Sequence, residues 1–108
     1  MNFEMKGIHF EIDPRTREYL ADKMPRLDFA KDLIVDFLLN ITKEKRRFSV
    51  EATINFRWGN STHVGVKSFD LFKGIDELFD TLDLKIEKEK SKLKEHHKKQ
   101  EPAGLGEE

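Results

Sequence analysis

Apolar residues alternate with polar ones at the start of the chain, which predicts a first strand. Phe3 and Met5 follow one phase of the alternation, whereas the apolar residues between positions 8 and 12 follow the opposite phase. Successive side chains of a strand point to opposite faces, so a change of phase requires an extra residue or a bend. Gly7 lies at this change. The pattern therefore predicts a strand over residues 3–12 with a bulge or bend at the glycine.

Asp13 and Pro14 predict the start of a first helix. An aspartate is a favourable N-cap, and proline is well suited to the first helical position because its missing N–H would have no partner there. Pro25 lacks the N–H that a longer helix needs, so the helix should end or kink near Met24. The predicted inward stripe consists of Tyr19, Leu20, Met24 and Leu27.

Three further strands are predicted between residues 35 and 69. Val35 begins an alternation through residue 41, and the apolar Leu38 suggests that this strand is partly covered on both faces. Residues 48–58 alternate cleanly, which is typical of an antiparallel strand with one side facing solvent. Gly59 and Asn60 favour a hairpin turn, after which residues 62–69 form the returning strand.

Asp70 is predicted to cap a final helix whose character changes halfway. From residue 71 to residue 86 apolar residues recur at helical spacing, which predicts a face packed on the core. They are Leu71, Ile75, Leu78, Phe79, Leu82 and Ile86. After this stripe lysines dominate, namely Lys85, Lys88, Lys90, Lys92, Lys94, Lys98 and Lys99. A helix that loses its apolar stripe projects into water or onto a polyanion.

The order of these elements predicts an α+β fold of the type β-α-β-β-β-α. Its two helices should pack on one face of a four-stranded mixed sheet. The chain has 108 residues, which suffices for one domain with a single core. We expect residues 1–99 to form this domain and residues 100–108, an acidic segment with Pro102, Gly104 and Gly106, to be a disordered tail.

The charge of the chain is unevenly distributed. Its formal net charge is −1, but residues 85–99 hold seven lysines and three glutamates. Residues 1–84 have a net charge of −2, and residues 100–108 have a net charge of −3. The final helix therefore has a local positive charge of the kind that favours binding to nucleic acid.

The residue types exclude most enzymatic chemistry. The chain has no cysteine, and the adjacent His96 and His97 face different directions on a helix, so we expect no metal and no cofactor. The carboxylates of Asp76, Glu77, Asp80 and Asp83 are interpreted as a solvated polar face rather than as a catalytic group. With no nucleophile and no glycine-rich phosphate loop, we expect no enzyme. No apolar run reaches the length of a membrane span, so a cytoplasmic protein without membrane contact is expected.

The lysine-rich helix has two interpretations. In the first it is a solvated helix end held by ion pairs of the Glu87–Lys90, Glu89–Lys92 and Glu95–Lys98 type. In the second its lysines neutralise nucleic-acid phosphates and release counterions. The basic turn with Lys45, Arg46 and Arg47 is either an ordinary charged hairpin tip or a second phosphate contact beside the helices. If the two helices lie side by side, their outer faces could share a positive groove.

Several segments resemble the short ribosome hibernation-promoting factor and protein Y family, whose members are also called ribosome-associated inhibitors or sigma-54 modulation proteins. Residues 5–13 resemble the family's first strand, glycine and helix start, and residues 16–20 match its Leu-Arg-Glu-Tyr-Val type segment. Residues 50–54 resemble its third strand. Residues 70–76 resemble its Asp-Met-Tyr-Ala-Ala-Ile-Asp helix start, and residues 91–96 resemble its lysine-rich end. The resemblance covers residues 1–97.

The resemblance implies a translation inhibitor of hibernating ribosomes in stress or stationary phase. Such a protein binds rRNA of the small ribosomal subunit at the decoding region and competes with mRNA and tRNA. Off the ribosome we expect a monomer, and without the second domain of long-form relatives we expect no pairing of two ribosomes by this chain alone. The family's rRNA-binding positions correspond to Arg17, Lys23, Arg26, Lys85, Lys88, Lys90, Lys92 and Lys94.

The chain departs from the family pattern at a few positions. Thr81, Leu84 and Glu89 stand where the family often has basic or neutral-polar residues, and Pro25 interrupts the first helix. Two other classes of function stay open. A double-stranded-RNA-binding domain has a related element order but lacks the first strand and the terminal lysine helix. A protein-interaction module, for example one that modulates a transcription factor, requires an exposed apolar patch.

Overall fold

The computed structural model describes the backbone of residues 1–100 and the side chains of residues 1–92. Apart from Gln100, the predicted acidic tail lies outside the described residues. The chain forms β1 (Asn2–Ile8), α1 (Pro14–Lys23), the 3-10 helix η1 (Met24–Ala30), β2 (Ile34–Lys43), β3 (Phe48–Phe56), β4 (Ser61–Ser68) and α2 (Leu71–Gln100). This order confirms the predicted β-α-β-β-β-α fold.

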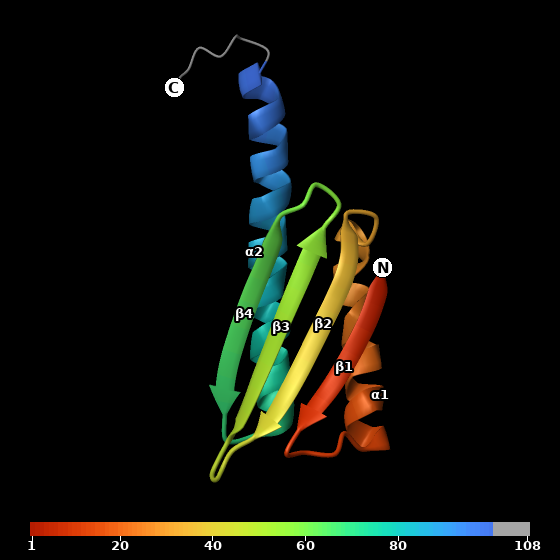
Figure 1. The fold of residues 1–108 in the computed structure, drawn as a ribbon, viewed down its shortest axis with the longest axis vertical. Helices are drawn as coiled ribbons and strands as arrows, with labels where there is room; N and C mark the ends of the chain where they lie inside the picture. Colours follow the sequence, from red (N-terminus) through yellow and green to blue (C-terminus); the bar gives the residue numbers. More distant parts are fainter. Residues whose placement is uncertain (101–108) are drawn as a thin grey trace.

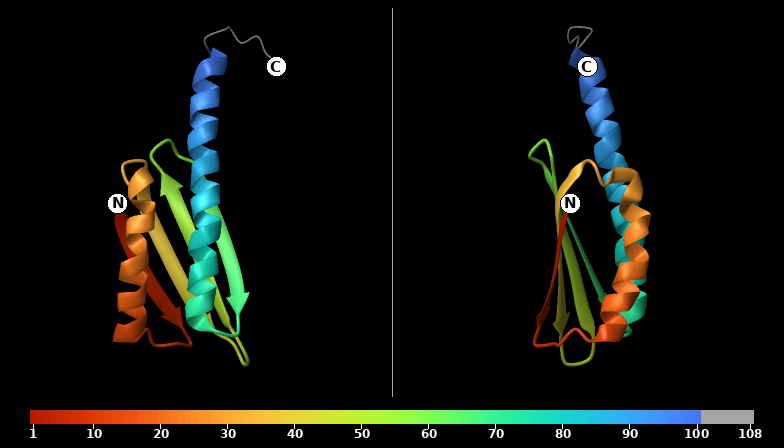
Figure 2. Two further views of the ribbon diagram at one scale, coloured as in Figure 1. Left: turned by 180° about the vertical axis from the view of Figure 1, so that it is seen from behind. Right: turned by 90° about the vertical axis from the view of Figure 1, so that its right-hand side faces the viewer.

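The four strands form one mixed sheet with the order β1-β2-β3-β4. β1 runs parallel to β2, and the other two neighbouring pairs are antiparallel. A parallel pair needs a crossover connection, which α1 and η1 supply. Both helices lie on the same face of the sheet, as predicted, and they run in the same direction (Figures 1 and 2). No helix of the described residues covers the other face of the sheet (Figure 2).

The first strand is shorter than predicted because the chain turns back at its end. β1 ends at Ile8, and His9 has a positive φ of 54°. A Cβ on Gly7 would lie 2.0 Å from the carbonyl oxygen of Phe10. The glycine is therefore required by the close approach of the returning chain, whereas the sequence predicted a strand continuing to Ile12. Ile12 is nevertheless buried, because the β1–α1 connection places it in the core.

A register shift changes the alternation at the start of β2. The sequence predicted Val35 as an inward residue, but Val35 is exposed and its neighbour Ile34 is buried. The pairing of β2 with β3 is irregular between Ile34 and Asp36, which exchanges the two faces at this point. From Phe37 onward the predicted alternation is confirmed. Such a shift depends on pairing with β3, so the local pattern does not reveal it.

The predicted helix ends are confirmed. Asp13 caps α1, where its Oδ1 accepts a hydrogen bond of 2.8 Å from the backbone N–H of Thr16. The α-helix ends at Lys23, two residues before Pro25, and the chain continues as η1. Asp70 caps α2, where its Oδ1 accepts backbone hydrogen bonds from the next turn.

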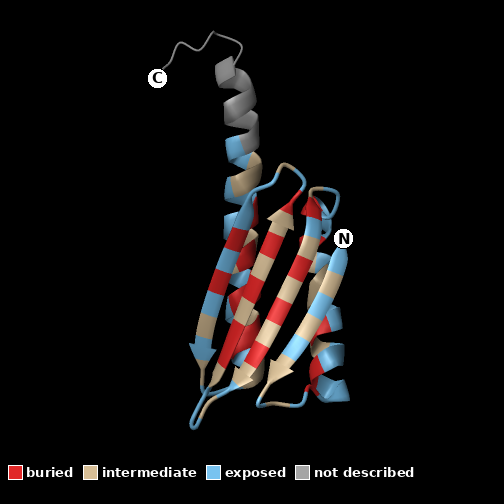
Figure 3. Ribbon diagram, in the orientation of Figure 1, coloured by how far each residue is buried: buried red, intermediate tan, exposed pale blue. Residues whose placement is uncertain are grey.

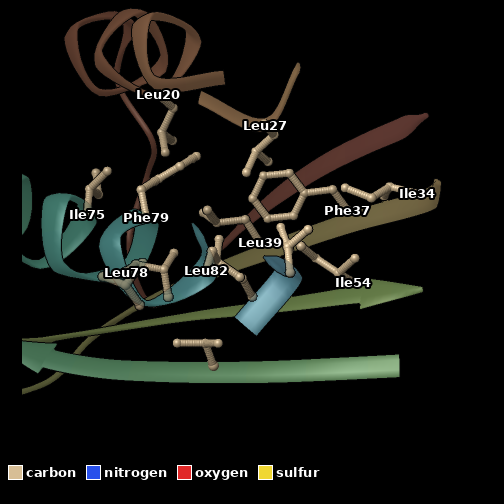
Figure 4. Close-up of a cluster of buried hydrophobic side chains, with 14 of the residues drawn as sticks. Leu20, Leu27, Ile34, Phe37, Leu39, Ile54, Ile75, Leu78, Phe79 and Leu82 are labelled. Atoms are coloured by element: carbon tan, nitrogen blue, oxygen red, sulfur yellow. The ribbon is translucent and has the colours of Figure 1, made fainter. Parts of the chain in front are cut away.

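The core lies between the helices and the sheet. The predicted α2 stripe is fully buried from Ile75 to Ile86, and Leu20 and Leu27 extend the core under α1 and η1 (Figure 4). The ring of Phe79 meets that of Phe37 edge-on at 6.0 Å. Figure 3 shows the buried positions as alternating bands along β2 and β3. Between Ile86 and Lys92, the last described side chain of α2, no residue is buried in this core.

Candidate nucleic-acid interface

The second half of α2 carries exposed lysines beyond the end of the core stripe. Lys85, Lys88 and Lys92 are all exposed, and within the described residues the ion pairs involve neither Lys85 nor Lys88. Lys92 makes a long contact of 3.8 Å with Glu89. Lys94 lies in α2, but its side chain falls outside the described part of the chain, as do Lys98 and Lys99. We call Lys85, Lys88 and Lys92 the lysine face.

Lys90 has a different role from its neighbours. Its side chain is half-buried, and its Nζ lies 3.5 Å from the backbone carbonyl oxygen of Phe29. The same ammonium group lies 5.3 Å from the centre of the Phe29 ring, which is a favourable cation–π distance. On the other side, Asn60 of the β3–β4 turn donates to Glu89 at 3.4 Å. These contacts hold the start of the lysine-rich segment against η1 and the sheet.

Two of the predicted ion pairs of a solvated helix end fall among the described side chains. One of these, Glu89–Lys92, is present as a long contact. Lys90 contacts Phe29 instead of Glu87, and the Glu95–Lys98 pair lies outside the described side chains. Exposed pairs of this kind contribute little even when their geometry is good. The lysine face is therefore largely uncompensated by neighbouring carboxylates of the described segment.

The two predicted contact residues at the end of α1 and in η1 are paired with carboxylates of α2. Nζ of Lys23 lies 2.9 Å from Oδ1 of Asp76. The guanidinium of Arg26 lies 2.8 Å from Asp80 and 2.5 Å from Asp83. Cations and carboxylates thus face each other along the contact between the helices, where the sequence analysis considered a continuous positive groove. We call these five residues the interhelical seam; Arg17 lies outside it and is exposed.

An aromatic stack extends the seam towards the start of both helices. The rings of Tyr19 and Phe72 are stacked at 4.3 Å, and the Tyr19 hydroxyl donates a hydrogen bond of 2.6 Å to Asp76. Arg15 lies over the free face of Phe72, and Lys23 lies over Tyr19. The residue pattern did not reveal this cluster, and the acidic residues were expected to form a solvated face. That expectation is wrong for Asp76 and Asp83, which are partly buried against α1 and η1, whereas Asp80 pairs with Arg26 but stays exposed, as expected.

A sequence signal for the seam exists in the matched spacing of the two helices. Residues 19, 23 and 26 are separated by four and three positions, and so are residues 76, 80 and 83. Such spacing places side chains on one face of a helix. Because the helices run in the same direction, the two rows meet in register (Figure 2). Recognising the match requires knowing that these helices are neighbours.

The seam shifts the pKa of Asp76, Lys23 and Arg26. The hydrogen bond from Tyr19 and the pairing with Lys23 hold the pKa of Asp76 below its ordinary value. The hydrogen bond with Asp76 raises the pKa of Lys23, and pairing with Asp80 and Asp83 raises the pKa of Arg26. The charged forms of these three groups are therefore favoured in the folded chain.

Replacing Asp76 with asparagine should destabilise the fold in a pH-dependent way. The pKa of Asp76 is lowered in the folded state, so its contribution is present above the ordinary pKa of 3.8 and is lost as the pH falls through the folded-state pKa. Urea unfolding should show a lower midpoint for D76N at about pH 7 and converging midpoints near about pH 2. The control is E77Q, at an exposed neighbouring carboxylate. An equal loss for D76N at every pH would contradict the prediction.

The basic turn between β2 and β3 lies far from the lysine face. Lys45 and Arg46 are exposed, whereas Arg47 and Lys67 each lie 3.5 Å from Glu44. The turn is at the end of the sheet where α1 and α2 begin, and the lysine-rich half of α2 is at the opposite end (Figure 1). The length of β3, nine residues or roughly 30 Å, separates the two ends. The structure therefore does not bring this turn beside the lysine face.

The three departures from the family pattern on α2 have different surroundings. Leu84 is 70% exposed, close to the lysine face along the helix. The Thr81 hydroxyl donates to the backbone carbonyl of Glu77 at 3.0 Å. Glu89 contacts Asn60 and Lys92, as described above. Only Leu84 therefore presents a large side chain to solvent in place of a charged group.

The described residues contain no cluster of three or more histidine, cysteine or acidic side chains that could hold a metal ion. In the same part of the chain, no helix combines the length and the apolar character that crossing a membrane requires.

Comparison with known proteins identifies relatives over most of the chain. Residues 3–94 match the family described as sigma 54 modulation protein / S30EA ribosomal protein. The ribosome hibernation promoting factor of Escherichia coli K12 is 29% identical over 96 residues, which cover 89% of this chain and all of the relative. That of Azotobacter vinelandii is 29% identical over 103 residues, or 95% of each chain.

Solved structures show the same architecture. A ribosomal subunit interface protein from Coxiella burnetii has a TM-score of 0.78 and 25% identity, covering 84% of this chain and 99% of its own. The N-terminal domain of Thermus thermophilus protein Y, at 24% identity, shares the fold with a TM-score of 0.72 over 82% of this chain and 98% of that domain. These relatives are binding proteins, which confirms that the chain is not an enzyme. The chain belongs to the sigma 54 modulation protein / S30EA ribosomal protein family.

Proposed function

We propose that this protein is a ribosome hibernation factor that acts in the cytoplasm and binds rRNA of the small ribosomal subunit. The single observation that supports this most strongly is the lysine face, three exposed ammonium groups on a helix that has left the core. Lysines in such a row bind phosphates as point charges and displace counterions. The names of the relatives, ribosome hibernation promoting factor and ribosomal subunit interface protein, support a ribosomal partner.

The predicted contact residues differ in how directly they bind rRNA phosphates. Lys85, Lys88 and Lys92, together with Arg17 and the predicted Lys94, bind rRNA phosphates. Lys90 holds the helix in place through Phe29, with its remaining N–H groups directed to the RNA. Lys23 and Arg26 bind phosphate only by sharing or exchanging their aspartate partners, so their net contribution is small. The strength of binding therefore rests mainly on α2.

The proposed mechanism is occlusion of the decoding region. The protein occupies the space that mRNA and tRNA need, and it inhibits translation by mass action rather than by turnover. In a purified translation assay, inhibition should saturate near about one protein per ribosome and be relieved by excess initiator tRNA and mRNA. With the five proposed phosphate contacts, affinity should fall roughly 100- to 500-fold between about 50 and 200 mM monovalent salt. The half-inhibitory concentration at each salt concentration measures this.

Three outcomes of this assay would contradict the proposal. Inhibition by far less protein than ribosomes would indicate turnover. Cleaved rRNA would have the same meaning. Inhibition that does not change with salt would indicate contact with a ribosomal protein rather than with phosphates.

A further inference from the structure

Phe69 is the most exposed large apolar side chain of the described residues. It is 76% exposed and lies between the last residue of β4 and the Asp70 cap of α2. Single exposed apolar residues are common and need no explanation by themselves. An exposed phenylalanine indicates a binding site only if it has no role in packing and if the neighbouring groups suit a ligand.

The structure gives Phe69 no packing role at the start of α2. A hydrophobic residue before an N-cap commonly packs on the fourth residue of the helix, but that residue here is Gly74, which has no side chain. The turn is held instead by Ser68, whose hydroxyl donates to the Asp70 carbonyl at 2.8 Å and accepts from the Asp70 N–H at 3.2 Å. The ring of Phe69 is therefore dispensable for folding.

The register of β3 and β4 places Phe69 at the end of the sheet that carries the basic turn. Phe48 pairs with Ser68 and Ser49 pairs with Lys67, and Phe69 follows directly after the last paired residue of β4. The turn between β2 and β3 and the connection from β4 to α2 lie at the same end of the sheet (Figure 1). We call the resulting surface the turn-end patch, which consists of Lys45, Arg46, Arg47, Lys67 and Phe69.

The turn-end patch keeps a strong positive charge. Glu44 is the carboxylate that contacts it, at 3.5 Å from both Arg47 and Lys67. Lys45 and Arg46 are exposed and make no ion pair among the described residues. Nearby, Lys43 lies 4.4 Å from the centre of the Phe48 ring, which adds a further cation at this end. An exposed aromatic ring and at least two cations without an ion pair among the described residues thus lie at this end of the sheet.

This combination fits an unpaired nucleotide. Single-stranded nucleic acid binds where cations contact the phosphates and an aromatic ring stacks on the base. A duplex offers phosphates but keeps its bases stacked, so it would leave the ring of Phe69 unused. An acidic protein surface would satisfy the cations but would leave the exposed ring without a matching group.

We propose that the turn-end patch binds an unpaired RNA nucleotide, with Phe69 stacked on the base and Lys45 and Arg46 on the flanking phosphates. The inference deepens the proposed function and rests on it in one respect, namely that the RNA is that of the small subunit. The patch and the lysine face lie at opposite ends of the sheet, so their contributions to binding should be independent.

The test measures binding of the full chain to a labelled single-stranded RNA of about 12 nucleotides by fluorescence anisotropy. The protein carries K88E and K92E in every case, so that the lysine face does not hide the patch. Phe69→Ala should weaken binding roughly 5- to 150-fold, the range of one lost base stack. Phe69→Trp should retain binding, and Phe69→Leu should behave like alanine because leucine has no π-face.

The salt dependence separates stacking from charge. Phe69→Ala should leave the slope of log affinity against log salt unchanged, whereas Arg46→Gln should reduce it by about 0.7. Val35→Ala, which truncates an exposed apolar residue on another part of the sheet, is the matched control and should bind normally. Thermal unfolding should confirm that all of these variants are folded.

Several results would overturn the inference. Binding of the RNA by the Phe69→Ala variant as tightly as by its parent would exclude stacking on this ring. Full binding by the Phe69→Leu variant would have the same meaning. Failure of the K88E and K92E parent, with Phe69 intact, to bind the oligonucleotide would also overturn the inference. If Phe69→Ala weakened binding to small subunits but not to free RNA, the partner would be a ribosomal protein, which also overturns it. Because the assay uses free RNA, a failure of the proposed ribosomal function would appear separately, as loss of sedimentation of the unmodified protein with small subunits.

Discussion

Reversing two charges of the lysine face, K88E with K92E, should reduce binding to small ribosomal subunits by at least about 100-fold. Each hydrogen bond to a charged partner contributes about 1.5–3 kcal/mol, and the new carboxylates would also repel the phosphates. Both side chains are exposed and lie outside the apolar stripe, so the stability of the fold should change little. Sedimentation with purified small subunits measures the binding, and urea unfolding measures the stability.

The control for this experiment is a second double reversal, K6E with K31E. It changes the net charge by the same amount at exposed positions outside α1 and α2. We expect it to retain most of the binding. If both double variants lost binding equally, the interaction would depend on overall charge and not on this helix. If K88E with K92E bound normally or unfolded, the lysine face would not be the contact surface.

Shortening Leu78 to alanine should cost about 2–5 kcal/mol of the free energy of unfolding. Leu78 has no exposed surface and packs in the cluster between α2 and the sheet, so its loss removes buried area and leaves a cavity (Figure 4). A domain of this size has about 5–15 kcal/mol in total, so the variant should be close to unfolding at physiological temperature. Urea titration followed by circular dichroism measures the change.

Leu84 provides a matched control on the same helix. It lies six residues after Leu78 and is 70% exposed, so Leu84→Ala should change stability by no more than about 0.5 kcal/mol. Ile75→Ala should behave like Leu78→Ala, since Ile75 is also fully buried. Equal effects at positions 78 and 84 would mean that the apolar stripe does not anchor α2 as described.

The interhelical seam changes what the basic residues of α1 and η1 can contribute to RNA binding. Lys23 and Arg26 are cations in a position that the family resemblance assigns to rRNA, yet their charges are already balanced by carboxylates of α2. Exchanging a carboxylate for a phosphate gains little, because one ion pair replaces another. The seam therefore stabilises the parallel packing of the helices and leaves the lysine face as the main attractive surface for phosphates.

Local sequence alone determined the order of the main strands and helices and the helix boundaries near Asp13, Pro25 and Asp70. The period of the apolar residues distinguishes strands from helices, and Asp13, Pro25 and Asp70 act on the adjacent backbone groups, so their effects are readable without a fold. The same reasoning predicted that α2 leaves the core after Ile86, since the stripe simply stops. These features depend on neighbours within one helical turn or one strand.

Only the tertiary structure decided which distant residues meet. Gly7 is required because the chain returns over it, and Val35 faces solvent because of its register with β3. The pairing of Asp76 with Lys23 needs two helices side by side, and the separation of the basic turn from the lysine face needs the strand directions. Hydrophobic periodicity specifies which face of an element is buried, but not which residue lies opposite. The ion pairs of the interhelical seam and the surroundings of Phe69 depend on which residues lie opposite one another, and the packing of the elements decides this.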